Sequence, residues 1–138
     1  MVYSTGWLYE KASDGRTNLE RQTEDYRRRI EITKPMTLIG SLSQMFAALT
    51  HYVHPTRLQA VSSSIPKVVL LTGDQDNLVQ PSNSVRMKNS MPEAEFIQWK
   101  ETGHGIHLQR LAEFNALIER VVEEGKERAS VDQKTKST

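Results

Sequence analysis

The run of residues 65–73, with the sequence IPKVVLLTG, constrains the fold of this chain more than any other feature. It is short, continuous and rich in Val and Leu, and Gly73 closes it. An apolar run without alternation is typical of a strand that is covered on both faces, as in a parallel sheet. A second strand is predicted over residues 93–100, and residues 81–92, bounded by two prolines, can hold one short helix between them.

A helix is expected after the second strand, because apolar residues recur along one helical stripe over residues 108–122 before Gly125. The order strand, helix, strand, helix indicates a parallel βαβ unit with a right-handed crossover. Two parallel strands alone leave an apolar edge unpaired. We therefore expect this unit to be the margin of a larger sheet, and the isolated chain to self-associate through the exposed strand edge.

Three helices are expected before the first strand. The first covers residues 18–32, where a Thr and a Glu three residues later form a capping box. The second is an amphipathic helix over residues 38–53, whose apolar side chains recur at three- and four-residue spacing. A short third helix begins at Pro55, and the serines at 62–64 are expected to end it.

Composition excludes several classes of function. The 138 residues are 37% hydrophobic and 25% charged with a net charge of +1, as in an ordinary globular domain. The one dense basic run, at 27–29, is surrounded by acidic residues and indicates a solvated helix face, so we expect no nucleic-acid partner. The absence of cysteine excludes disulfides, thiolate catalysis and zinc-thiolate sites.

No apolar stretch approaches the roughly 20 residues that cross a bilayer, and the N-terminal sequence MVYSTGWLYEKASDG lacks the pattern of a signal peptide. We therefore expect no membrane span and no secretion from this start, and a cytoplasmic location.

Polar loops follow both predicted strands. The first, GDQD at 73–76, carries Asp74 and Asp76, and the second, TGHG at 102–105, carries His104. In parallel sheets ligands bind at the carboxyl ends of the strands, where neighbouring loops share one crevice. A carboxylate that accepts the Nδ1 proton of an imidazole fixes its tautomer and stabilises the imidazolium that forms when Nε2 takes a proton. The sequence thus predicts two members of a catalytic triad.

These residues lie in a stretch that resembles the α/β-hydrolase superfamily. The resemblance covers residues 65–122, through GDQDNLVQPSNS, MPEAEFIQWKETGHGIHLQ and EFNALIERV. Upstream, LIGSLSQMFAALTHYVHPTRL is similar to the helical segment before the acid-bearing strand, and TNLERQTEDYRRR to part of the cap. The resemblance implies that Asp76, the last residue of a Gly-x-x-Asp turn, is the acid and that His104 is the base.

The fold that this resemblance implies is an incomplete α/β-hydrolase three-layer sandwich, with two parallel strands, flanking helices and a helical cap segment. Residues 1–62 would form the cap and connecting helices, and residues 63–125 the C-terminal part of the core. Residues 126–138 are polar and aperiodic, and we expect them to be disordered.

The nucleophile elbow of the superfamily, Gly-x-Ser-x-Gly, is absent from this chain. The nearest sequence, GSLSQ at 40–44, lies inside a predicted helix, so neither Ser41 nor Ser43 is expected to be a nucleophile. The resemblance implies the C-terminal part of a serine hydrolase that acts on an ester, lactone or related acyl substrate without a cofactor. The alternative is a catalytically silent remnant that serves as an interaction module.

Other polar residues near the predicted site are given simpler roles. Asp74 is expected to orient the turn, with the acid role as its alternative. His107 and the two acids could be read as a metal site, but His107 is expected to line or cap a helical turn, and we expect no metal. The sequence DQDN resembles a calcium loop, but Leu78 and Val79 stand where a ligand and the turn glycine are needed.

Two further groups are interpreted as structural. His51 and His54 follow an apolar helix, where an imidazolium favours the C-terminal dipole. Four methionines could line an acyl pocket but are expected to fill an irregular core: Met36, Met45, Met87 and Met91.

Overall fold

The computed structural model describes residues 2–136. The chain divides into two compact units. The larger unit combines the residues up to Trp7 with those from His54 onward, and the smaller unit is Leu8–Val53. The helix of residues 55–64, which the sequence groups with the N-terminal helices, belongs instead to the unit that contains the strands.

The larger unit is built on two parallel strands. β1 (Val69–Gly73) and β2 (Glu95–Trp99) pair along their whole length, with the first residues of both strands opposite each other. α5 (Pro81–Ser90) connects them and begins with the proline that the sequence places there. The predicted strand–helix–strand order and the parallel pairing are thus confirmed, and the chain has a mixed α/β fold.

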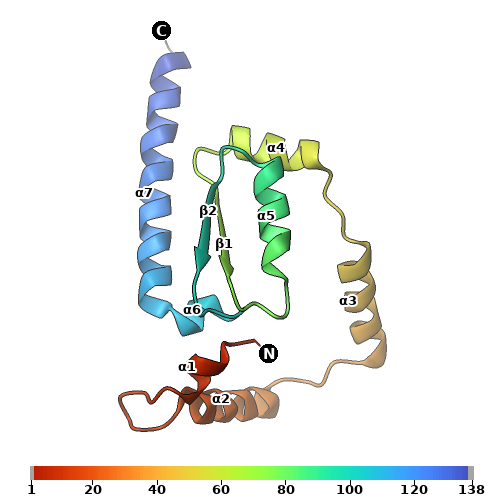
Figure 1. The fold of residues 1–138 in the computed structure, drawn as a ribbon. Coiled ribbons are helices and arrows are strands. Elements are labelled where there is room, and N and C mark those ends of the chain that lie inside the picture. The colour runs from red at the N-terminus through yellow and green to blue at the C-terminus, as the bar shows by residue number, and fades with distance from the viewer. Residues whose placement is uncertain (1, 137–138) are drawn as a thin grey trace. The chain divides into compact units, whose positions relative to one another are not determined.

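Helices flank the two strands on both sides (Figure 1). α5 contacts both strands and also α4 (Pro55–Ser64), while α7 (Leu111–Lys136) runs beside β2. Among the described residues of this unit, the buried apolar side chains are few, namely Met91, Ala94 and Leu117. The apolar residues of β1 at 69–71 are only half-buried, although the sequence of this strand is typical of complete burial.

The C-terminal helix is longer than the sequence predicts. α7 continues to Lys136, so the prediction of disorder from Lys126 is wrong for residues 126–136, and residues 137–138 lie outside the described residues. The expected single helix is also divided, because α6 (Ile106–Gln109) ends at Arg110 before α7 begins. The side chain of Arg128 donates to the carbonyl oxygen of Pro66 at 3.3 Å, which ties the extension of α7 to the start of the sheet.

The serines at 62–64 also differ from the prediction, since all three lie within α4 rather than after it. The hydroxyl groups of Ser63 and Ser64 both donate to the carbonyl oxygen of Ala60 at 3.2 and 2.5 Å, and Ser62 Oγ donates to Glu93 Oε2 at 2.7 Å. These bonds satisfy the hydroxyl groups inside the helix, so the serines need not leave it.

A network of four charged side chains joins α7 to the amino ends of the strands. Lys67 Nζ lies 2.6 Å from Glu95 Oε2 and also pairs with Glu124, and its side chain is only 9% exposed. Arg120 pairs with both acids, at 2.7 Å from Glu95 Oε1 and 2.8 Å from Glu124 Oε1. Hydrogen bonds from Arg120 and Lys67 lower the pKa of Glu95 to about 2.

The smaller unit holds two longer helices. α2 (Asn18–Ile32) has the predicted capping box, in which Thr17 Oγ1 accepts from Glu20 N at 3.2 Å and Glu20 Oε2 accepts from Thr17 N at 2.7 Å. α3 (Leu38–Thr50) begins after an N-cap at Thr37 and buries none of its side chains. α1 (Thr5–Tyr9) spans the boundary between the units. None of the helices in residues 2–136 has the length and apolar character to cross a bilayer.

The charged network predicts a pH-dependent part of the stability. Because the folded pKa of Glu95 lies below the unfolded value of 4.5, its contribution is complete above about pH 4.5 and is lost as the pH falls toward 2. We expect Glu95→Gln to lower the free energy of unfolding by about 1–2 kcal/mol at neutral pH. Urea titrations followed by circular dichroism measure this difference.

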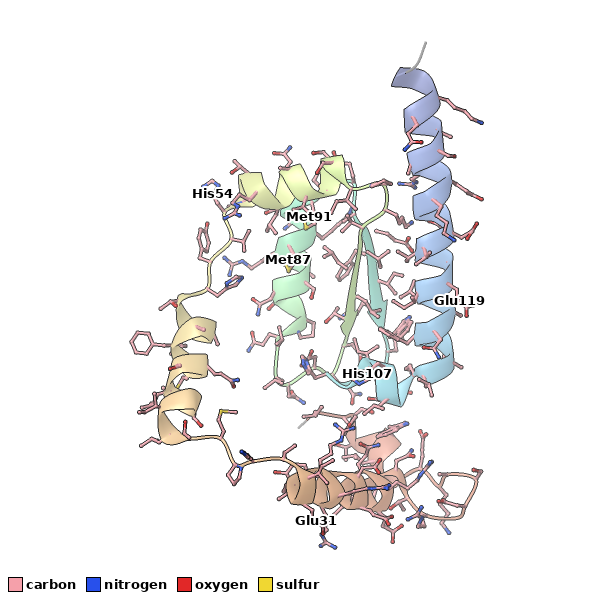
Figure 2. The ribbon with its side chains drawn as sticks, turned by 180° about the vertical axis from the view of Figure 1, so that it is seen from behind. Glu31, His54, Met87, Met91, His107 and Glu119 are labelled. Carbon is pink, nitrogen blue, oxygen red and sulfur yellow. The ribbon has the colours of Figure 1, made fainter. Side chains whose placement is uncertain are left out.

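The matched control is Glu119→Gln, because Glu119 is an exposed acid of α7 outside the network (Figure 2). Its free energy of unfolding should stay within about 0.5 kcal/mol of that of the unsubstituted chain. Equal losses for the two variants at neutral pH, or a Glu95→Gln difference that persists unchanged at about pH 2.5, would contradict the role of the network.

The exposed apolar surface predicts self-association. Among residues 2–136, β1 pairs only with β2, and α7 leaves Leu111, Ile118 and Val122 about half exposed. A small core offsets little chain entropy, and an unpaired strand edge is a template for pairing with another chain. We expect the weight-average mass in sedimentation equilibrium to rise with concentration, and unfolding in urea to be shallow. A monomer that unfolds in a steep single transition would show that the chain is self-sufficient.

Candidate active site

The candidate site lies at the carboxyl ends of β1 and β2, where two loops continue the pairing of the strands. The backbone N–H of Asp74 donates to Trp99 O at 3.0 Å, and that of Gln75 donates to Thr102 O at 2.9 Å. In the opposite direction the N–H of Thr102 donates to Asp74 Oδ1 at 3.2 Å. These three hydrogen bonds hold the first loop against the second.

Gly73 permits this close approach of the loops. A Cβ atom at this position would lie 2.1 Å from the carbonyl oxygen of Thr102, closer than any side chain can come to a backbone atom. Thr102 itself is completely buried. The glycine is thus required by the distance between the two loops.

Asp76 is buried and held by backbone donors of its own loop. Its Oδ1 accepts from Leu78 N at 2.9 Å and from Val79 N at 2.8 Å, and the residue is 7% exposed. The other oxygen, Oδ2, lies 2.8 Å from Nδ1 of His104. Because an ionised carboxylate can only accept hydrogen bonds, this contact places the proton on Nδ1.

The charge state of Asp76 results from opposing effects. Burial alone would raise the pKa of this carboxyl, but the hydrogen bonds from Val79 N–H, His104 and Leu78 N–H outweigh it. The pKa of Asp76 therefore lies below its usual value. The carboxyl is ionised at neutral pH and can accept a proton-bearing imidazole nitrogen.

His104 is the exposed partner of the pair. Its side chain is 42% exposed, whereas that of Asp76 is 7% exposed. Nδ1 is engaged by Asp76, and Nε2 makes no hydrogen bond to any of the residues that the structure describes. An imidazole held in this way presents Nε2 as a proton acceptor toward a group outside the pair.

The structure thus brings together the two residues that the sequence singles out, Asp76 and His104. Asp74, the alternative acid, instead accepts from the backbone N–H of Thr102 in the second loop, so its side chain bridges the two loops. The catalytic role of the pair stays a prediction. The sequence did not predict Leu78 and Val79 as members of the site, because they contribute backbone N–H groups that no side-chain pattern marks.

The histidine at 107 lies outside this arrangement. The side chain of His107 is exposed, and its ring is 6.3 Å from the ring of Phe114 in an edge-on contact within the region of α6 and α7 (Figure 2). Among the side chains that the structure describes, no three of His, Cys, Asp or Glu are grouped so that they could hold a metal ion.

The remaining candidates have separate places. Of the four methionines, Met91 is buried, whereas Met36, Met45 and Met87 are exposed, so the expected core role applies to Met91. His54 precedes α4 and accepts a hydrogen bond from Thr56 N at 3.3 Å, which makes it an N-cap (Figure 2). His51 is the C-cap residue of α3. Ser41 and Ser43 lie inside α3 and not on a strand-to-helix turn.

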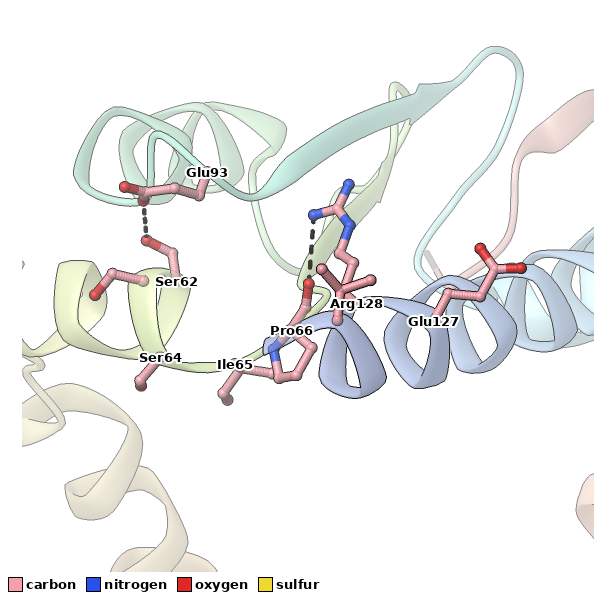
Figure 3. A pocket seen from close by; sticks show the side chains of 9 residues that line it. Ser62, Ser64, Ile65, Pro66, Glu93, Glu127 and Arg128 are labelled. Atoms are coloured by element: carbon pink, nitrogen blue, oxygen red, sulfur yellow. Dashed lines mark hydrogen bonds between the residues drawn. The ribbon is translucent and has the colours of Figure 1, made fainter. Parts of the chain in front are cut away.

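A cavity of about 550 Å³ lies at the opposite, amino end of the strands (Figure 3). Ser62 Oγ donates to Glu93 Oε2 at 2.7 Å, and Arg128 donates to the carbonyl oxygen of Pro66 across its lining. Ser62, Glu93 and Arg128 thus bond within the lining, and the cavity is separated from His104 by the length of β2.

Comparison with known proteins adds no relationship: no family model matches the chain, and neither the curated proteins nor the solved structures contain a match.

Substitution of two glycines by alanine is expected to have opposite effects on stability, because only Gly73 lies where the two loops approach closely. Gly73→Ala forces a Cβ atom against Thr102 and should lower the free energy of unfolding by about 1–3 kcal/mol. Gly125→Ala lies within α7, where the added Cβ meets only Lys67 Cβ at 3.6 Å, and should raise it by about 0.5–1 kcal/mol. Urea titrations of both variants measure the difference, and a neutral Gly73→Ala would contradict the close approach.

Proposed function

We propose that this chain is the C-terminal part of a serine hydrolase of the α/β-hydrolase fold that acts on an ester, lactone or related acyl substrate. Asp76 is the acid and His104 the base of a Ser-His-Asp triad. The nucleophile and the oxyanion hole are supplied by polypeptide other than these 138 residues. The chain alone is therefore inactive.

One observation carries this proposal: the contact of 2.8 Å between Asp76 Oδ2 and His104 Nδ1 at the carboxyl ends of two parallel strands. The acid is buried and the imidazole is exposed, which is the arrangement that a triad requires. An unrelated surface acid and histidine would need neither the two backbone donors that hold Asp76 nor the loop pairing that brings His104 to it.

The chemistry follows from this geometry. Nε2 of His104 accepts the proton of a serine hydroxyl as its oxygen attacks the acyl carbon, and the imidazolium that forms is stabilised by the carboxylate of Asp76. The same Nε2–H then protonates the leaving alcohol, which returns the imidazole to its neutral form. Water repeats the cycle on the acyl-enzyme, with His104 again taking and returning one proton.

The nucleophile is assigned outside the chain because the sequence contains no Gly-x-Ser-x-Gly elbow and the serines nearest to that pattern lie inside α3. A nucleophilic serine stands on a strained strand-to-helix turn that exposes its Oγ, and the following backbone N–H contributes to the oxyanion hole. Ser41 and Ser43 lie within α3, where their backbone N–H groups are part of the helix. Without an oxyanion hole, the negative charge that develops on the acyl oxygen is not stabilised, and a positioned imidazole alone supplies only the general-base part of catalysis.

The decisive experiment extends the chain with the sequence that its gene encodes in frame before Met1. We expect a strand, Gly-x-Ser-x-Gly and a helix, and an extended protein that a fluorophosphonate probe labels. In that protein His104→Ala should abolish labelling, and Asp76→Asn should lower turnover on the order of 10²–10⁴-fold. Asp74→Asn is the matched control and should cost far less, since Asp74 contacts the backbone of Thr102 and not His104.

An unrelated upstream sequence, or an extended protein in which Asp76→Asn and Asp74→Asn have equal effects, would contradict the proposal. The first outcome would favour a catalytically silent remnant that serves as an interaction module.

For the 138-residue chain itself we expect no turnover of short p-nitrophenyl esters above the rate of free imidazole, and no labelling by the probe. Initial rates at matched imidazole concentration test this. A burst of p-nitrophenol that is lost in Ser41→Ala or Ser43→Ala would place the nucleophile in α3 and overturn the assignment.

A further inference from the structure

Gln109, the last residue of α6, is a buried side chain that the proposed chemistry does not use. It is 8% exposed, and its carboxamide makes four hydrogen bonds. Oε1 accepts from Gly103 N at 3.0 Å and from Ser4 N at 3.4 Å. Nε2 donates to Glu101 O at 2.6 Å and to Ser4 Oγ at 2.6 Å. Every donor and acceptor of the amide is thus engaged, and the opposite orientation would face two N–H donors with an NH₂ group.

These bonds converge on the loop that carries His104. Glu101 and Gly103 stand just before the histidine, so the carboxamide of Gln109 fixes the backbone on its amino side. Glu101 has a φ of 52°, in the left-handed region that non-glycine residues rarely adopt. A backbone held in such a conformation persists only where surrounding contacts determine it, and the bond from Gln109 to the carbonyl of Glu101 is one of these.

The residues at 2–4 hold the other side of the same loop. Gly105 N donates to Val2 O at 2.8 Å. A Cβ atom on Gly105 would lie 2.2 Å from the ring of Tyr3, so the ring packs directly on the loop backbone. Ser4 is buried and is bonded to Gln109 at both its N–H and its hydroxyl. The backbone is therefore held on both sides of His104, at Gly103 by Gln109 and at Gly105 by Val2. Gln109 also bonds to Ser4, so it connects the two sets of contacts.

We propose that Gln109 is a positioning residue, which holds the loop of His104 so that Nδ1 stays within hydrogen-bond distance of Asp76. Its importance for catalysis rests on the proposed function, whereas its effect on the histidine does not. Gln109 touches neither ring nitrogen and acts only through the backbone at 101–103. Without its carboxamide, the strained turn at Glu101 relaxes and the exposed imidazole leaves the carboxylate.

The test observes His104 directly in the ¹⁵N-labelled 138-residue chain. Long-range correlation spectra at about pH 8, where imidazoles are largely neutral, report which ring nitrogen carries the proton. In the unsubstituted chain we expect the Nδ1–H tautomer and slow exchange of this proton with water. Gln109→Ala should mix the tautomers and accelerate the exchange about tenfold or more, since the bond to an ionised carboxylate is weakened.

Four variants make the result specific. Ser4→Ala removes one bond of the carboxamide and should have a smaller effect in the same direction, which keeps the test open if Gln109→Ala does not fold. Gln98→Ala removes an exposed carboxamide from β2 and should leave the His104 signals unchanged. Lys67→Met weakens the fold at the far end of the strands and should also leave them unchanged. Gln109→Glu keeps the acceptor toward Gly103 N but loses the donor to Glu101 O, so it should resemble Gln109→Ala.

The outcomes separate this inference from the proposed function. If Asp76→Asn changes the His104 signals but both Gln109→Ala and Ser4→Ala leave them unchanged, the positioning role is wrong and the pair stands. If Lys67→Met changes them as strongly as Gln109→Ala, Gln109 acts through overall stability and the inference fails. If Asp76→Asn has no effect on His104, the pair that carries the proposed function is itself absent.

Discussion

The parallel pairing of β1 and β2 is the constraint on which the rest of the larger unit depends. A parallel pair cannot be joined by a tight turn, so α5 must return the chain to the amino end of β2 before the second strand begins. The register then sets both carboxyl ends level with each other, Gly73 opposite Trp99. Two loops that start from the same edge are close enough to continue the pairing, and Asp76 and His104 meet for this reason.

Much of this arrangement could be predicted because its signals are local. The strand of residues 69–73 is marked by an uninterrupted apolar run, α5 by a proline at its start, and α2 by the reciprocal capping of Thr17 and Glu20. The meeting of Asp76 and His104 required only one further rule, that parallel strands end at the same edge. Position after a strand was sufficient, because the loops are short and the backbone leaves them little freedom.

The features that the sequence did not reveal depend on contacts between distant residues. The polar end of α7 contacts the segment before β1 through Arg128, whose side chain bonds to Pro66 O, and no apolar period in the sequence marks this contact. Gln109 contacts Ser4, which is 105 residues away in the chain, and neither residue belongs to a recognisable motif. The partial exposure of β1 was not predicted either, because its apolar sequence indicates a strand that is covered on both faces, whereas the described residues cover it only in part.

The two ends of the strands are stabilised by different kinds of interaction. At the amino end, the partly exposed charges around Lys67 and Arg120 attract one another through a path that mobile ions can enter. At the carboxyl end, the loops are held by neutral hydrogen bonds, among them those of the buried carboxamide of Gln109. Added salt therefore weakens the charged network that attaches α7, whereas the neutral hydrogen bonds of Gln109 and of the loop backbones depend much less on ionic strength. Salt concentration thus changes how firmly α7 is attached to the strands and has little effect on the bonds that hold the site.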